Sequence, residues 1–192
     1  MKANQQSKRV EAARANIDPL KNPFLPVAAQ LGFPDEFLVA MSATTALVML
    51  GVRARLVAGS ARWLLMSDEE QGEALLTQQK PLDYFGYEFS LTEALTELVT
   101  MHVPESMHVW TVDDSGTIYD FTGEDQMSQF ESLCVHSWPA ARRLPPAIVG
   151  TSEDLQVNGW FYEEDEQATS FALRLVQFLM FNALRQQTQH HP

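Results

Sequence analysis

The feature that most constrains the fold of this chain is a stretch without a charged residue, residues 37–52. The residues just before it, Pro34, Asp35 and Glu36, supply helix-start signals, and Gly51 supplies a stop signal. Apolar residues form one stripe and cover most of the remaining helix surface: Phe37, Ala40, Met41, Thr44, Leu47 and Val48 in the stripe, and Leu38, Val39, Met49 and Leu50 beside it. We therefore expect a central helix that is buried nearly all round.

Strand signals follow this helix. Residues 52–58 alternate as in a half-buried strand, which we expect to break at Gly59. Residues 107–112 and 117–121 predict a hairpin around the turn Asp113-Asp114-Ser115-Gly116. We expect Arg55 to begin the first strand of an antiparallel sheet that also contains both hairpin strands. The expected fold class is therefore α+β, a buried helix packed on an antiparallel sheet.

The other elements are expected around this core. Before the core we expect a polar helix over residues 5–17, closed by Asp18 and Pro19, and a short helix over 27–31. Within it we expect an insertion over about 67–106, with a helix over 91–101 that is opened by Ser90 and Glu93. After it we expect a helix over 124–133, an extended crossover at Pro139, Pro145 and Pro146, a strand over 155–162, and a docking helix over 168–185 with one face formed by Phe171, Leu175, Phe178, Leu179 and Asn182. We divide the chain into an N-terminal helical arm, residues 1–21, and one domain, residues 22–192.

Composition limits the function classes. With 45% hydrophobic and 20% charged residues the chain is typical of a globular protein. Its net charge is −12, and no cluster of Lys and Arg with interleaved aromatics is present, which excludes ordinary nucleic-acid binding through a basic patch. Acidic runs at residues 68–70, 113–114 and 163–166 are either solvated loops or a surface that imitates a polyanion.

The cysteine count and the apolar runs bear on compartment. Cys134 is the only cysteine, so an internal disulfide or a multi-cysteine metal site is impossible. The apolar runs are shorter than the roughly 20 residues that a spanning helix needs. We expect a cytoplasmic protein without a membrane segment, a metal or a cofactor, and the oligomeric state stays open.

One ordered series of elements carries a family resemblance. The buried helix leads through Gly51-Val52-Arg53-Ala54-Arg55 to a strand, then to a strand with His108-Val109-Trp110 and a returning strand with Tyr119-Asp120-Phe121-Thr122. Over about residues 33–123 this order resembles the transglutaminase-like superfamily, which has a papain-like core. The resemblance implies that His108 is a base, that Asp120 orients it, and that Trp110 belongs to the same H-x-W element. The family's nucleophilic cysteine, which lies at the start of the helix, is missing, since Glu36 stands at or near that position.

Three functions follow from this pattern. The first is a catalytically inactive transglutaminase-like protein that binds another protein through its former cleft or its acidic surface. In that cleft Glu36, His108 and Asp120 could form a cluster that lodges a cation or a basic side chain, and aromatic residues could border it or belong to the core: Trp63, Tyr84, Phe85 and Tyr87.

The second function is a hydrolase or acyltransferase that uses Ser42, or a displaced Cys134, together with His108 and Asp120. Ser42 stands almost two turns inside the expected helix, where hydroxyls usually bond to the carbonyl four residues back. The third function is an acidic inhibitor or immunity-like protein, for which the fold would be incidental. An enzyme needs a nucleophile within hydrogen-bond reach of His108, whereas a mimic needs its carboxylates on one exposed face.

Overall fold

The computed structural model of the chain describes residues 2–64, 84–90, 92–94, 96, 107–123 and 144–189. Its elements are α1 (Lys2–Lys21), the 3-10 helix η1 (Asn22–Phe24), α2 (Leu25–Leu31), α3 (Asp35–Met49), β1 (Ala54–Leu64), β2 (Tyr84–Tyr87), β3 (His108–Asp113), β4 (Ile118–Asp120), β5 (Ile148–Gly150), α7 (Ser152–Gln156), β6 (Trp160–Glu164) and α8 (Glu166–Gln189). The expected α+β class is confirmed. Within the described ranges no helix is both long and apolar enough to cross a bilayer.

Strand β1 is the centre of a six-stranded antiparallel sheet, in which pairing runs through β2-β1-β3-β4-β5 and β6 also pairs with β1. Along one edge of β1, residues 54–59 pair with β3 and residues 61–64 pair with β2. Along the other edge, residues 59–63 pair with β6. The sheet therefore contains the strands of His108 and Asp120 next to the strand of Arg55, as the sequence predicts.

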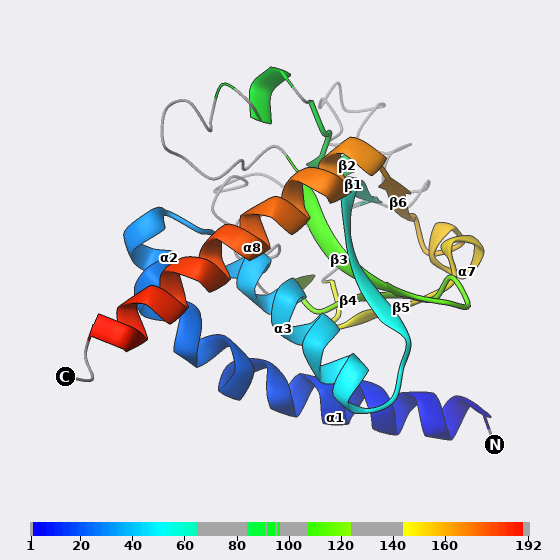
Figure 1. The fold of residues 1–192 in the computed structure, drawn as a ribbon. Coiled ribbons are helices and arrows are strands. Elements are labelled where there is room, and N and C mark those ends of the chain that lie inside the picture. The colour runs from blue at the N-terminus through cyan, green and yellow to red at the C-terminus, as the bar shows by residue number, and fades with distance from the viewer. Residues whose placement is uncertain are drawn as a thin grey trace, which may run out of the picture.

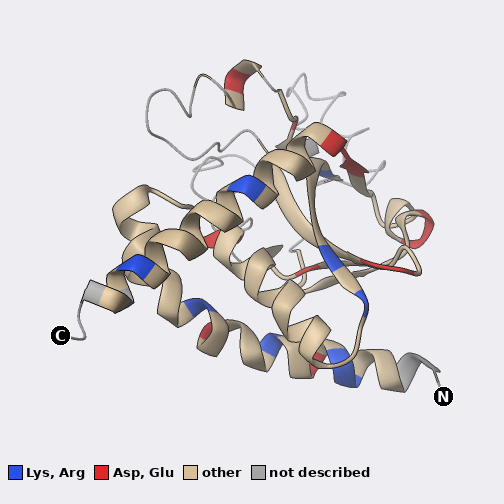
Figure 2. Cartoon of the chain, in the orientation of Figure 1, with Lys and Arg blue, Asp and Glu red and all other residues tan. Residues whose placement is uncertain are grey.

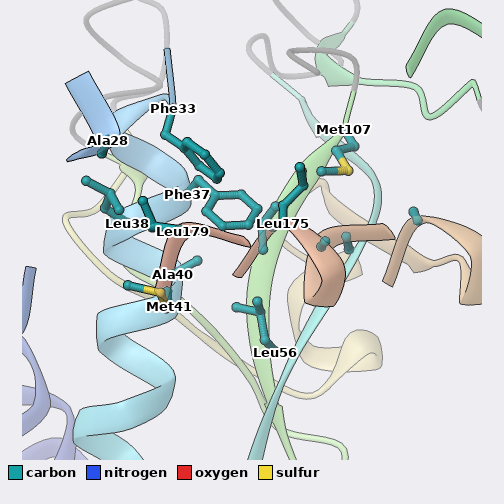
Figure 3. Packing of buried hydrophobic residues seen from close by; sticks show 14 of the residues in the cluster. Ala28, Phe33, Phe37, Leu38, Ala40, Met41, Leu56, Met107, Leu175 and Leu179 are labelled. Carbon is teal, nitrogen blue, oxygen red and sulfur yellow. The ribbon is translucent and has the colours of Figure 1, made fainter. Parts of the chain in front are cut away.

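Helices α1, α3 and α8 form a layer on one face of this sheet (Figure 1). Helix α3 lies against β1 and β3, and a hydrogen bond of 2.7 Å joins the hydroxyls of Thr44 and Thr111 across that contact. Figure 3 shows Phe37 of α3, Leu175 of α8 and Leu56 of β1 within the apolar core of this layer. Helix α1 runs along α3 and buries Ala13 there.

The central helix is where the sequence places it. Pro34 caps the start of α3 in an extended conformation, and Gly51 follows its end with φ = 78°, a left-handed value that favours glycine. Residues 37–43 are all buried, as are Ala46 and Leu47. The expectation of burial nearly all round is wrong for the last turn, where Val48 and Met49 are 52% and 69% exposed because no described element covers them.

Gly59 does not break β1, so the expected break is wrong. The strand runs through this residue from Ala54 to Leu64. A Cβ atom at position 59 would lie 2.1 Å from the carbonyl oxygen of Glu163. The glycine therefore permits the close approach of the β6 backbone. Such an approach explains a glycine inside a strand without a break in the strand.

The predicted hairpin is confirmed, and each end of its two strands lies within one residue of the expected position. Strands β3 and β4 pair through Thr111 with Tyr119 and Val112 with Ile118. In the turn, Gly116 has φ = 79°. The Asp113 carboxylate accepts hydrogen bonds from the backbone N–H groups of Ser115 and Thr117, at 2.8 and 3.0 Å, and these contacts fix the turn.

The helical ends of the chain differ in part from expectation. Helix α1 continues through Asp18 and Pro19 to Lys21, so its expected end is wrong; the buried Ile17 shows that this part of the helix packs against the body. Helix α2 begins two residues earlier than expected. The C-terminal helix is confirmed and longer, and its buried face contains Leu175 and Leu179, whereas Phe178 is half exposed.

Residues 148–164 differ most from the sequence-based expectation. Strand β5 was not expected, and the strand predicted over 155–162 starts only at Trp160. Leu155 instead belongs to α7, which begins with a capping box between Thr151 and Asp154. The capping box therefore makes residues 152–156 helical, although the apolar pattern predicted a strand from residue 155. The predicted helix over 124–133 and most of the one over 91–101 lie outside the described residues, although the Glu93 backbone N–H does donate to the Ser90 hydroxyl at 3.4 Å.

Replacing Ala40 with Asp should lower the free energy of unfolding by about 3 kcal/mol or more, because the new charge would have no partner in the core. Ala40 is 3% exposed. Thr45→Asp, on an exposed position of the same helix, is the matched control and should cost about 1 kcal/mol or less. Urea unfolding measures both, and equal stability of Ala40→Asp and the unmodified protein would contradict a buried α3.

Candidate functional site

The candidate site lies on the face of the sheet opposite to α3. Side chains alternate between the two faces of a strand. Val109 of β3 and Met107, just before that strand, belong to the apolar cluster that contains Phe37 and Met41 of the helical layer. Trp110 belongs instead to the cluster on the other face, and the His108 ring stacks on Trp110 with 5.7 Å between ring centroids. His108 therefore points away from α3.

An aromatic cluster encloses His108, which is 2% exposed. Its ring lies between Tyr87 and Trp110, stacked on both at interplanar angles of 17° and 19°. Trp63 meets the ring edge-on, with centroids 5.2 Å apart, and Tyr162 is tilted against it at 6.1 Å. Because β2, β1, β3 and β6 each contribute a ring to this face, strand register alone brings the cluster together.

Asp120 is the hydrogen-bond centre of the site. Its Oδ2 atom lies 2.8 Å from His108 Nε2 and accepts a hydrogen bond from the Tyr162 hydroxyl at 2.7 Å. Its Oδ1 atom accepts from the backbone N–H and the hydroxyl of Thr122, at 2.9 and 2.6 Å. Trp63 Nε1 donates to the Tyr162 oxygen at 3.1 Å and extends the network. The carboxylate is thus satisfied on both oxygens although it is fully buried.

Burial and hydrogen bonding oppose each other at Asp120. Burial works to raise the pKa of its carboxyl group, but the charge and hydrogen bond of His108 and the hydrogen bonds from Thr122 together hold that pKa below its ordinary value. The group is therefore ionised at neutral pH, which makes His108 Nε2 the donor in their hydrogen bond. The pKa of Tyr162 is raised well above its ordinary value by burial and by the neighbouring Asp120 charge, so its hydroxyl stays protonated.

Ser42 faces away from the sheet. Thr44 points to the sheet, since its hydroxyl bonds to Thr111. Two residues along a helix are about 200° apart, so Ser42 lies on the opposite side of α3. Its hydroxyl has no hydrogen-bond partner within the described part of the chain, unlike those of Thr44 and Thr45, which bond to the carbonyls four residues back. The structure does not bring Ser42 and His108 together.

Of the other expected site residues, some join the cluster, one lies in the helical layer, and the rest have side chains outside the described part of the chain. Trp63, Tyr87 and Trp110 join His108 and Asp120 in the cluster. Glu36 lies in the first turn of α3, in the helical layer, next to Asp35, whose carboxylate accepts from Lys21 of α1 at 2.8 Å. Tyr84 belongs to β2, but its side chain is outside what the structure describes, as are Cys134 and the side chain of Phe85.

Sequence reasoning missed Tyr162 and Thr122. Thr122 had a local signal, because an Asp side chain commonly accepts a hydrogen bond from the backbone N–H two residues further along the chain, which forms an Asx turn. Tyr162 had only the aromatic alternation of Trp160 and Tyr162, and its contact with Asp120 depends on the pairing of Tyr162 with Ala61 across β1 and β6. A contact set by strand register over 42 residues has no local sequence signal.

Chemically, the site is a buried ionised carboxylate that holds an imidazole between aromatic rings. Its described contacts to His108 include no serine or cysteine, and no group of three His, Cys, Asp or Glu side chains in the described ranges is placed to hold a metal ion. The fold and site define an α+β protein with a buried His–Asp pair. Comparison with protein-family models, curated proteins and solved structures found no match for the chain.

Replacing Asp120 with Asn should cost about 3–5 kcal/mol at pH 7, because the buried His108 ring and Tyr162 hydroxyl would lose the carboxylate that accepts their hydrogen bonds. Since the pKa of Asp120 is lowered in the folded state, its stabilisation is present above the ordinary Asp pKa of about 4 and is lost as pH falls through the lower folded pKa. The difference between the two proteins should therefore shrink below pH 4 in urea unfolding.

Asp114→Asn is the control for this measurement, since Asp114 is 61% exposed and pairs with the exposed Arg53. It should change stability by about 0.5 kcal/mol or less. A Thr122→Val variant, which removes one donor to Asp120, provides a milder test if Asp120→Asn does not fold, with an expected loss of about 1–3 kcal/mol. An Asp120→Asn difference that does not change with pH would contradict an ionised Asp120 at the centre of the site.

Proposed function

We propose that this chain is a catalytically inactive transglutaminase-like protein that acts by binding another protein. Support for the relationship comes from the order of its elements, a buried helix ended by Gly51, then β1, and then neighbouring strands that carry His108 and Asp120. The hydrogen bond of 2.8 Å between His108 and Asp120 matches the pairing that the resemblance implies. The residues that a related enzyme would use for catalysis would therefore serve the structure of this protein.

The separation of Ser42 from His108 is the observation that carries the proposal of inactivity. The His108 ring is on the face of the sheet away from α3, and Ser42 is on the side of α3 away from the sheet. A general base must come within hydrogen-bond reach of the proton it removes. The sheet and the helix lie between the two groups, so an acyl-enzyme on Ser42 would need the core to rearrange.

The surface of α8 supports a role in protein binding. Its exposed apolar side chains include Leu173, Met180, Phe181 and Leu184, at 43%, 46%, 64% and 61% exposure. Large apolar side chains that gather on one helix face are typical of protein interfaces rather than of free surfaces. This surface belongs to the helical layer and not to the former cleft, so the binding role does not depend on the His108 site.

Treatment with a fluorophosphonate probe, followed by intact-mass measurement, tests inactivity. We expect no adduct on Ser42, because no base among the described residues lies within hydrogen-bond reach of its hydroxyl. Alkylation of Cys134 with iodoacetamide should likewise leave protein binding unchanged, since we propose no thiol-dependent step. A Ser42 adduct that disappears in a His108→Ala variant would overturn the proposal in favour of a hydrolase. Ser42→Ala is the control for labelling at other sites.

A further inference from the structure

A groove of about 410 Å³ opens in the helical layer, between α3 and α8. Its walls include Met41 and Thr45 of α3 and Thr169, Leu173 and Val176 of α8, and Leu56 of β1 lies at its base. Figure 1 shows that α3 and α8 both cross the front of the sheet and diverge toward the start of α8, with β1 visible between them. Among the described elements, no helix fills the space over the sheet between α3 and α8, where the groove lies.

Exposed apolar side chains extend the groove on both sides. On α8, Leu173, Met180 and Leu184 are spaced by seven and four residues, which places them on one face of the helix. On α3, Val48 is three residues beyond Thr45 and seven beyond Met41, so it continues the same wall, and it is 52% exposed. The groove and its borders therefore form one apolar surface, which we call the α3–α8 surface.

The end of this surface nearest β6 is acidic, whereas Arg55 lines the groove and Arg174 is exposed farther along α8. Arg55 makes two hydrogen bonds to the Glu164 carboxylate, and Arg53 pairs with Asp114 at 2.9 Å, so these groups neutralise each other. Glu163 and Glu166 are exposed and make no ion pair with another described residue. Glu166 precedes Leu173 by two helical turns and shares its face, and Figure 2 shows acidic residues at the start of α8 and along the adjoining β6.

We propose that the α3–α8 surface binds an amphipathic helix of another protein, with apolar side chains in the groove and basic residues against Glu163 and Glu166. This inference rests on the proposed binding function and names its partner. A groove between two helices accepts a third helix with apolar residues at i, i+3, i+4 and i+7. The acidic end of the groove selects a basic partner.

The net charge decides between possible occupants. A second copy of a chain with a net charge of −12 would bring like charges together. An anionic lipid surface would be repelled for the same reason. A basic helix gains attraction at the acidic end and apolar burial along the groove.

The test measures binding of an 18-residue peptide of Leu and Lys, with the leucines at helical i, i+3, i+4 and i+7 spacing, by fluorescence anisotropy. Its counterpart with Glu in place of Lys is the charge control. We expect the Lys peptide to bind at least tenfold more tightly than the Glu peptide, with affinity falling as salt rises. Leu173→Glu should weaken binding at least tenfold, and Glu166→Lys about threefold or more.

Val157→Glu is the matched control variant. Val157 is 88% exposed and follows α7, whose Leu155 packs on the other face of the sheet. This variant adds the same charge without touching the groove and should bind the Lys peptide as the unmodified protein does. Circular dichroism melts of each variant establish that it is folded. Equal weakening by Val157→Glu, or no weakening by Leu173→Glu, would overturn the site.

The failure of this inference differs from the failure of the proposed function. If a partner from the source cells is retained equally by the unmodified protein and by Leu173→Glu, protein binding stands and the α3–α8 surface is not its site. If sedimentation shows a dimer that Leu173→Glu dissociates, the occupant is a second copy and the basic-helix proposal is wrong. A fluorophosphonate adduct on Ser42, in contrast, overturns the inactive-protein proposal and leaves the peptide result unaffected.

Discussion

Strand β1 is the constraint on which the rest of the structure depends. It pairs with three other strands, and its two faces belong to different layers. Leu56 and Ala58 pack under the helices, whereas Val57, Ala61 and Trp63 belong to the aromatic face. Because side chains alternate strictly along a strand, each residue that pairs with β1 is assigned to one layer or the other. This assignment places His108 on the face away from Ser42, and the pairing of β3 with β4 places Asp120 on that face too.

The same strand explains how much of the fold the sequence could predict. The buried helix, the hairpin and the C-terminal helix each carry a strong local pattern, and all three are present. Gly59 was expected to end a strand, because glycine weakens a strand locally; its true role depends on the backbone of β6, more than 100 residues away. Leu155 lies in a helix because a capping box precedes it. Local pattern thus predicts elements, while pairing and caps decide their limits.

The candidate site could be predicted only in part, for a related reason. The H-x-W and Asp120 elements are close in sequence, and the expected contact between His108 and Asp120 is present at 2.8 Å. Tyr162 comes from the opposite edge of β1 and has no sequence relation to them. The face on which His108 lies depends on the strand register, because a shift of one residue would move its side chain to the other face. The sequence also does not give the orientation of α3, so it leaves Ser42 among the candidate nucleophiles.

The orientation of α3 against β3 is measured most directly by disulfide formation in a Cys134→Ser background. In a Thr44→Cys, Thr111→Cys protein the two sulfurs would replace hydroxyl oxygens that lie 2.7 Å apart, a separation from which an S–S bond of about 2.0 Å can form. We predict that this pair closes under mild oxidation and that the Ser42→Cys, Thr111→Cys pair stays reduced. Closure of the Ser42 pair, with the Thr44 pair left reduced, would contradict the separation of Ser42 from the sheet and with it the proposed loss of catalysis.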